Sequence, residues 1–98
     1  MSDRFVLRPE AEIELDEAYN WYEDQKEGLG ESFFEYVDHM LVRISQRPQS
    51  YGIVYRDVRR AIMSRFPYVI YYRVVSDQVI VISIFHGRRN PKEWQSRR

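Results

Sequence analysis

Residues 68–85 decide the fold: Tyr68-Val69-Ile70-Tyr71-Tyr72-Arg73-Val74-Val75, then Ser76-Asp77-Gln78, then Val79-Ile80-Val81-Ile82-Ser83-Ile84-Phe85. The first run is rich in the β-branched and aromatic residues that favour strands, and the three polar residues after it are typical of a tight hairpin turn. The last run is apolar on both of its faces, which is typical of a central strand covered on both sides. The stretch therefore predicts an antiparallel hairpin in the middle of a sheet.

Strand and helix patterns lie before this hairpin. Residues 4–8 predict a short strand that Pro9 stops, and residues 58–63 predict another strand. Between them, apolar residues recur at helical spacing over residues 10–26 and again over residues 33–44. The order predicts one α+β domain over residues 1–98, in which a helical hairpin packs on a mostly antiparallel four-stranded sheet.

The composition narrows the class of protein. There is no cysteine, so neither a disulfide nor a thiolate metal site is possible, and with two histidines we expect no metal. No phosphate-binding loop or other cofactor motif is present, so we expect no cofactor. The first residues lack the apolar stretch of a signal peptide, and no apolar run approaches the roughly 18 residues of a membrane span. We therefore expect a cytoplasmic protein without a membrane partner.

Charge divides the chain into two halves. Residues 1–50 hold twelve acids and five bases, a net charge of −7, whereas residues 51–98 hold ten bases and three acids, a net charge of +7. Thirteen of the fifteen bases are arginine, whose planar guanidinium suits phosphate and carboxylate groups. Such an asymmetry concerns binding partners rather than the fold, and it favours an anionic partner for the second half.

Strand alternation selects candidate site residues. Tyr71 and Arg73 share one face of their strand, and His86 follows the last strand, where a neutral imidazole can act as a general base. With Arg60 on the preceding strand, these side chains form a basic, aromatic surface that suits single-stranded RNA or an acidic protein segment. The alternative is that the tyrosines pack across strands and that His86 bonds a neighbouring loop.

The predicted order of strands and helices, together with three sequence motifs, resembles the RelE/ParE toxin superfamily over residues 5–94. The resemblance rests on Arg65-Phe66-Pro67-Tyr68, on Tyr72-Arg73-Val74 and on His86-Gly87-Arg88-Arg89-Asn90-Pro91. It implies the toxin of a type II toxin–antitoxin (plasmid stabilisation) system, neutralised by a small antitoxin whose C-terminal arm masks the basic surface. ParE-like members inhibit DNA gyrase, and RelE-like members cut messenger RNA in the ribosomal A site.

The resemblance leaves the activity open between these branches. His86, Arg73 and Arg65 match catalytic positions of a RelE-like, metal-independent nuclease. However, the chain has only two lysines for ribosome binding, and the C-terminal tyrosine of that branch is absent, with Trp94 lying nearest. The Gly-Arg-Arg-Asn-Pro ending favours a ParE-like gyrase inhibitor, which is not an enzyme. A third alternative is a non-toxic antitoxin-binding or operon-regulatory protein. For binding to target or partner we expect the following residues: Arg60, Tyr71, Arg88, Arg89 and Trp94.

Overall fold

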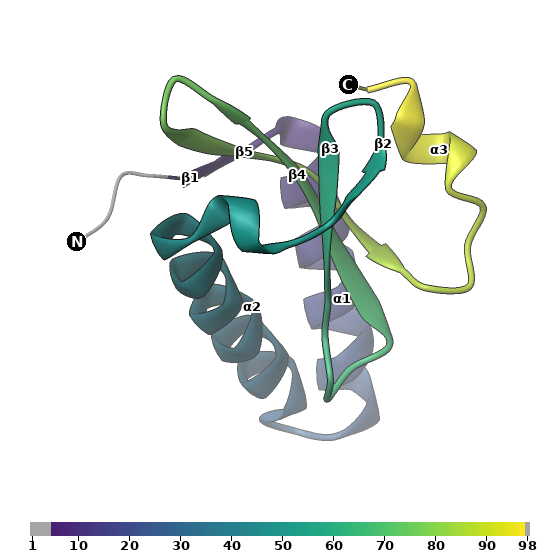
Figure 1. The fold of residues 1–98 in the computed structure, drawn as a ribbon. Helices are drawn as coiled ribbons and strands as arrows, with labels where there is room; N and C mark the ends of the chain where they lie inside the picture. The colour runs from purple at the N-terminus through teal and green to yellow at the C-terminus, as the bar shows by residue number, and fades with distance from the viewer. Residues whose placement is uncertain (1–4, 98) are drawn as a thin grey trace.

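Five strands form a single mixed sheet in the order β1-β5-β4-β3-β2 (Figure 1). The structure is a computed structural model that describes residues 5–97. Strand β1 pairs in parallel with β5, and the other neighbouring strands are antiparallel. In chain order, the elements are β1 (Phe5–Leu7), α1 (Pro9–Gln25), α2 (Leu29–Gln46), the 3-10 turn η1 (Pro48–Ser50), β2 (Ile53–Tyr55), β3 (Val58–Ile62), β4 (Tyr68–Val75), β5 (Gln78–His86) and α3 (Lys92–Gln95).

The structure confirms the α+β class and the helical hairpin but corrects the number of strands from four to five. The additional strand, β2, has three residues, and Ile53 and Val54 in it are exposed, so neither length nor burial marks it in the sequence. It pairs with Val58 and Arg59 at the start of β3. The predicted strand over residues 4–8 is β1, although Arg4 lies outside the described residues.

Helix α1 begins at Pro9, one residue before the predicted start, and has Glu10 and Glu12 near the positive end of the helix dipole. It ends at Gln25, and α2 follows after Gly28, whose φ of 88° lies in the left-handed region that favours glycine. The short connection turns the chain back on itself, so the two helices lie antiparallel on one face of the sheet (Figure 1).

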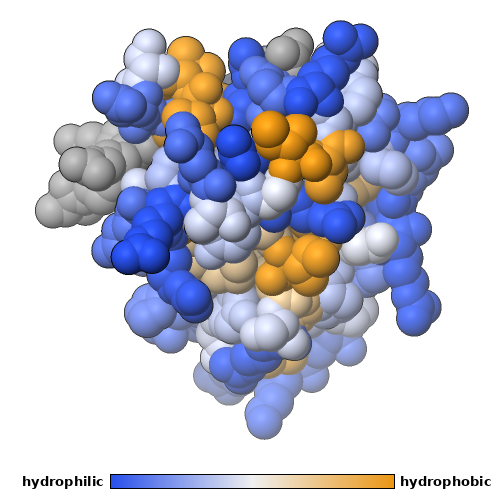
Figure 2. Space-filling view, viewed as in Figure 1, coloured by the Kyte–Doolittle hydropathy of each residue, from blue (hydrophilic) through white to orange (hydrophobic). Residues whose placement is uncertain are grey.

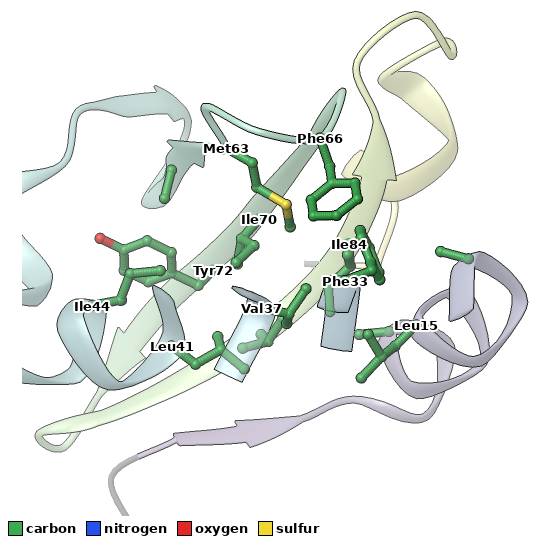
Figure 3. Packing of buried hydrophobic residues seen from close by; sticks show 14 of the residues in the cluster. Leu15, Phe33, Val37, Leu41, Ile44, Met63, Phe66, Ile70, Tyr72 and Ile84 are labelled. Atoms are coloured by element: carbon green, nitrogen blue, oxygen red, sulfur yellow. The ribbon is translucent and has the colours of Figure 1, made fainter. Parts of the chain in front are cut away.

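The larger core cluster lies between this helical hairpin and the sheet (Figure 3). Phe33 and Val37 of α2 point toward Ile70 and Ile84 of the two longest strands, while Leu15 contributes from α1. Each such buried aliphatic or aromatic side chain stabilises the fold by about 1.5–3 kcal/mol relative to its exposed state. The alternation predicted for β4 is confirmed, because Ile70 and Tyr72 lie in this cluster and Val69 and Tyr71 lie in the other.

The smaller cluster covers the opposite face of the sheet. It consists of Val58, Val69, Tyr71, Ile82, Phe85 and Trp94. Strand β5 therefore has apolar neighbours on both faces, as its sequence predicts, and α3 supplies the cover on this side through Trp94.

A β-bulge interrupts the pairing of β5 with β4. Tyr71 lies opposite Ser83, but Tyr72 lies opposite Val81, so Ile82 is an extra residue in β5. Strand β1 pairs only as far as Val81, which leaves the following part of β5 without a neighbouring strand on that side.

The side chain of Glu14 of α1 accepts hydrogen bonds from β5 along this uncovered edge. Its Oε1 accepts hydrogen bonds from the amide of Ile84 (3.0 Å) and from the hydroxyl of Ser83 (2.8 Å). Its Oε2 lies 2.9 Å from Nη1 of Arg97, which also donates to the carbonyl of Ile82 (3.4 Å). One carboxylate thus ties α1, the bulge and the C-terminal segment together.

We predict that Glu14→Ala lowers the free energy of unfolding by about 3 kcal/mol, because it leaves a largely buried arginine and an amide without their acceptor. Urea denaturation followed by circular dichroism measures the change. The matched control is Glu17→Ala on the exposed side of the same helix, for which we expect a change of at most about 0.5 kcal/mol. Equal effects of the two variants would contradict this role of Glu14.

A second prediction concerns Tyr72, whose hydroxyl donates to the carbonyl of Pro48 (2.5 Å). Burial raises the pKa of Tyr72 to about 12, from 10.0 for an ordinary tyrosine. Since the pKa is higher in the folded chain, the contribution of the neutral phenol is fully present below pH 10 and is lost between pH 10 and about 12. We expect the difference in unfolding free energy between wild type and Tyr72→Phe to fall across this window; a constant difference would contradict the prediction.

Candidate functional site

The face of the sheet under α3 carries most of the residues that the sequence selects. Tyr71 and Trp94 stack with ring centroids 4.0 Å apart and an interplanar angle of 26°. Only 9% of Tyr71 and 1% of Trp94 is exposed, so the two rings form the floor and the cover of a packed cluster. These aromatic rings therefore pack against each other beneath the surface, and little of either ring is accessible to a partner.

Arginines lie around this cluster. Arg60 is exposed and sits opposite Tyr71 in the β3–β4 ladder. Arg73 lies on the same face, and its guanidinium contacts Oδ2 of Asp57 through Nε (3.1 Å) and Nη2 (3.0 Å). Because Asp57 already balances its charge, Arg73 attracts an incoming anion less than Arg60 does.

His86 lies elsewhere, at the end of β5 and on the helix side of the sheet. It pairs with Tyr68, and the two rings meet edge to face at 5.3 Å. Its Nδ1 accepts a hydrogen bond from the amide of Arg88 (3.1 Å). A pocket of about 370 Å³ opens beside it, lined by Trp21, Tyr22, Pro67, Tyr68, His86 and Arg89.

The bulge at Ile82 explains why His86 is on this side. In a regular antiparallel ladder, the partner of Tyr71 would be Ile82, and His86 would share the face of Tyr71. The extra residue shifts the pairing by one, so His86 lies opposite Tyr68 and turns toward α1. Arg73 lies opposite Ile80, five residues or about 17 Å along β4 from Tyr68.

The segment after β5 presents the two adjacent arginines of the Gly-Arg-Arg-Asn-Pro motif. Arg88 is exposed. Arg89 is also exposed, but it forms an ion pair with Glu93 (2.7 Å) and lies over the ring of Phe85, 4.4 Å from the ring centroid. The side-chain carbonyl of Asn90 accepts from the amide of Lys92 (3.0 Å) and fixes the turn into α3.

Arg65 occupies a third place, in the turn between β3 and β4. Its guanidinium lies 5.3 Å from the centre of the Phe66 ring, and it lines a groove against α2. The structure therefore brings Arg60, Tyr71, Arg73 and Trp94 together on one face, but it does not bring Arg65, Arg73 and His86 into one site.

Sequence reasoning missed two residues of the His86 pocket. More than half of the Trp21 side chain is exposed, although tryptophan is a large apolar residue. In the sequence, Trp21 lies off the buried stripe of α1, and this position is the signal for a second contact surface. Tyr68 also lines this pocket. Burial raises the pKa of its phenol. Since burial keeps this hydroxyl protonated, it is a hydrogen-bond donor at neutral pH rather than a base.

Within residues 5–97, no group of three or more potential ligands is placed to hold a metal ion. In the same part of the chain, no helix combines the length and the apolar character that crossing a bilayer requires.

Comparison with known proteins places this architecture among toxins. Residues 5–91 match the family model of the ParE toxin of the type II toxin–antitoxin system parDE. Toxin ParE2 of Mycobacterium tuberculosis, in strains CDC 1551 / Oshkosh and ATCC 25618 / H37Rv, is 25% identical over 92 residues, which cover 93% of this chain and 88% of the relative. The chain belongs to the ParE toxin family.

A solved structure has the same fold. A chain of the chromosomal ParDE toxin–antitoxin system from P. aeruginosa superposes with a TM-score of 0.62 at 18% sequence identity. The match covers 84% of this chain and 92% of that chain. The family match over residues 5–91 confirms the sequence-based assignment to the RelE/ParE superfamily, with the ParE-like branch favoured.

We predict that Trp94→Ala lowers the free energy of unfolding by about 3 kcal/mol, because it removes the ring that covers Tyr71 and leaves a cavity. Denaturant unfolding measures the loss, and near-ultraviolet circular dichroism reports the changed surroundings of Tyr71. Trp94→Phe keeps a ring and should lose less. The matched control is Gln95→Ala in the same helix, and a loss equal to this control's would show that α3 contributes no packing.

Proposed function

We propose that this chain is a gyrase-inhibiting toxin that acts in the cytoplasm and is neutralised by a cognate antitoxin. Membership of the ParE toxin family supports the toxin role. The geometry of the sheet supports inhibition by binding rather than by catalysis.

One observation carries this choice. The Tyr71–Trp94 stack fills the face of the sheet where Arg73 lies, and His86 points to the other side of the sheet. A nuclease must hold its general base and its phosphate-binding arginines within hydrogen-bond reach of one reacting group. At a separation of about 17 Å along the strand, His86 and Arg73 cannot act on the same phosphodiester.

The target-binding surface consists of exposed arginines around a rigid apolar centre. Arg60, Arg88 and Arg89 provide the charge, and the Tyr71–Trp94 stack holds the underlying backbone in place. Arginine is enriched among the residues that dominate the energy of protein interfaces, because it combines charge, planarity and several donors. Such a surface suits an acidic region of the gyrase protein.

The antitoxin binds through its C-terminal arm, which covers arginine-bearing surface of the second half of the chain. That half has a net charge of +7, so an acidic arm gains from electrostatic complementarity in both association rate and orientation. Masking these arginines is sufficient for neutralisation if they are the residues that reach gyrase.

A gyrase supercoiling assay on the purified chain tests this proposal. We expect inhibition by the wild type, relief when the antitoxin from the neighbouring reading frame is added, and intact messenger RNA in a ribosome-programmed cleavage assay. Arg88→Glu should weaken inhibition by about tenfold, because it reverses an exposed charge on the binding surface.

The charge-matched control is Lys26→Glu, which lies at the connection of α1 and α2 and should inhibit like the wild type. Cleavage of messenger RNA in the A site that is lost in His86→Ala or Arg73→Ala would instead establish the RelE-like nuclease. If the chain binds the antitoxin but affects neither gyrase nor messenger RNA, it is a non-toxic partner protein.

A further inference from the structure

The pocket beside His86 gathers aromatic side chains at one place on the surface. On the face seen in Figure 2, by contrast, apolar surface lies in separate areas with hydrophilic surface around them. Among the described residues, the lining of the pocket combines aromatic rings with a proline and an arginine: Trp21, Tyr22, Pro67, Tyr68, His86 and Arg89. This composition suits a ligand that has both a planar ring and an anionic group.

The rings follow one another from α1 to the end of β5. Trp21 meets Tyr22 with ring centroids 5.1 Å apart, Tyr22 lies 6.2 Å from Tyr68, and Tyr68 lies 5.3 Å from His86. The planes of these neighbours are inclined by 60° or more, so the rings do not stack on one another. Since 57% of Trp21 is exposed, its indole ring keeps surface on which a planar ligand can stack.

The polar groups of the rings are placed to donate hydrogen bonds. His86 accepts at Nδ1 from the amide of Arg88 (3.1 Å), so the neutral imidazole carries its proton on Nε2. Burial raises the pKa of the Tyr68 phenol, so this hydroxyl also keeps its proton at neutral pH. The carbonyl oxygens and ring nitrogens of a nucleobase are acceptors that match such donors.

Arg89 supplies the positive charge of the pocket. Its ion pair with Glu93 is made through Nη2 (2.7 Å), whereas a guanidinium has five N–H donors. Half of the Arg89 side chain is exposed, so an incoming oxyanion can reach it. No carboxylate is among the lining residues that the structure describes, so a cationic ligand would lack a counter-charge there. The charge therefore favours a phosphate group over a cation.

Backbone hydrogen bonds hold the rim of the pocket in place. The amide of Gly87 donates to the carbonyl of Pro67 (2.9 Å), and the amide of Arg89 donates to the carbonyl of His86 (3.1 Å). A ligand thus meets a site that is already formed, which lowers the cost of ordering on binding. The volume of about 370 Å³ is near the lower end of the range for small-molecule sites and suits a single nucleotide.

We propose that this pocket binds one nucleoside monophosphate, with the base stacked on Trp21 and the phosphate held by Arg89. His86 and Tyr68 donate hydrogen bonds to the base. This site lies apart from the Tyr71–Trp94 stack, and the inference does not depend on gyrase as the target.

Calorimetry of the intact chain with the 5′-monophosphates of adenosine, guanosine, cytidine and uridine tests the proposal. At least one of them should bind with a dissociation constant below about 1 mM. Binding should quench the fluorescence of Trp21, whereas Trp94, which is only 1% exposed, should contribute little to the change. The matching nucleoside and inorganic phosphate should each bind at least about tenfold more weakly, because each keeps only one of the two main contacts.

Two variants separate these contacts. Trp21→Ala should raise the dissociation constant of the monophosphate by at least about tenfold, and Trp21→Phe should recover part of the loss because it restores a ring. Arg89→Gln should weaken binding of the monophosphate by about tenfold but leave binding of the nucleoside unchanged.

The matched controls are Ile13→Ala, on the same helix and as exposed as Trp21, and Arg56→Gln, an exposed arginine outside the pocket. Both should bind the monophosphate within about twofold of the wild type. All four positions are exposed, so circular dichroism should show an unchanged fold.

A single strand of ten nucleotides of the preferred base, as DNA and as RNA, distinguishes the two sources of such a ligand. A strand that competes with the monophosphate and loses affinity in Trp21→Ala supports a pocket that also takes a nucleotide within a strand. A strand that does not compete supports a pocket for the free nucleotide.

Three results would overturn the proposal. The first is no binding of any of the four monophosphates at about 10 mM. The second is binding that Trp21→Ala and Arg89→Gln leave unchanged. The third is inorganic phosphate that binds as tightly as the monophosphate, because the rings would then contribute nothing.

Discussion

The carboxylate of Glu14 is the interaction on which the arrangement of the sheet depends. Strand β5 lies between β1 and β4, yet β1 accompanies it only to Val81, and beyond this point that edge of β5 has no neighbouring strand. A buried amide without a partner costs about 1–3 kcal/mol, so this edge needs an acceptor. Glu14 supplies it and is itself balanced by Arg97 from the end of the chain. The first helix and the last residues are therefore bound to the same few atoms of β5.

The β-bulge beside this carboxylate decides which side chains share a surface. The extra residue Ile82 reverses which side chains at the end of β5 face each side of the sheet. His86 therefore faces the helices, while Tyr71 and Arg73 remain on the face under α3. Two polar regions of different character result. One has a histidine beside aromatic rings, and the other has arginines around a closed apolar cluster. The separation suits a protein that acts by contact over an area better than one that concentrates several groups on a single bond.

The sequence predicted the parts of the fold that depend on regular periodicity. Strand β4 has the predicted bounds, and the buried stripe of α1 follows the helical spacing because each of its residues meets the same core. Strand β2 could not be predicted, since it has three residues and depends on pairing with the beginning of β3 rather than on burial. The bulge in β5 could not be predicted from the sequence for another reason. In a strand that is apolar on both faces, inserting one apolar residue leaves the pattern unchanged.

The candidate site shows the same division. Alternation along β4 correctly placed Tyr71 with Arg73, because that strand is regular. The position of His86 needed the register of β5, which the composition does not reveal. The ion pair of Arg73 with Asp57 and the stacking of Trp94 on Tyr71 also join residues distant in sequence, and these contacts decide how much of each side chain a partner can reach.

The position of Trp94 and Arg97 after the last strand of the sheet has a consequence for synthesis. During translation the helices and the first strands emerge before the residues that close the second face of the sheet. Until Trp94 reaches Tyr71 and Arg97 reaches Glu14, the cluster of Val69, Ile82 and Phe85 has no cover on that side. A nascent chain that lacks these residues thus presents a different surface from the folded protein. The second face of the sheet is therefore completed only after all five strands have been synthesised.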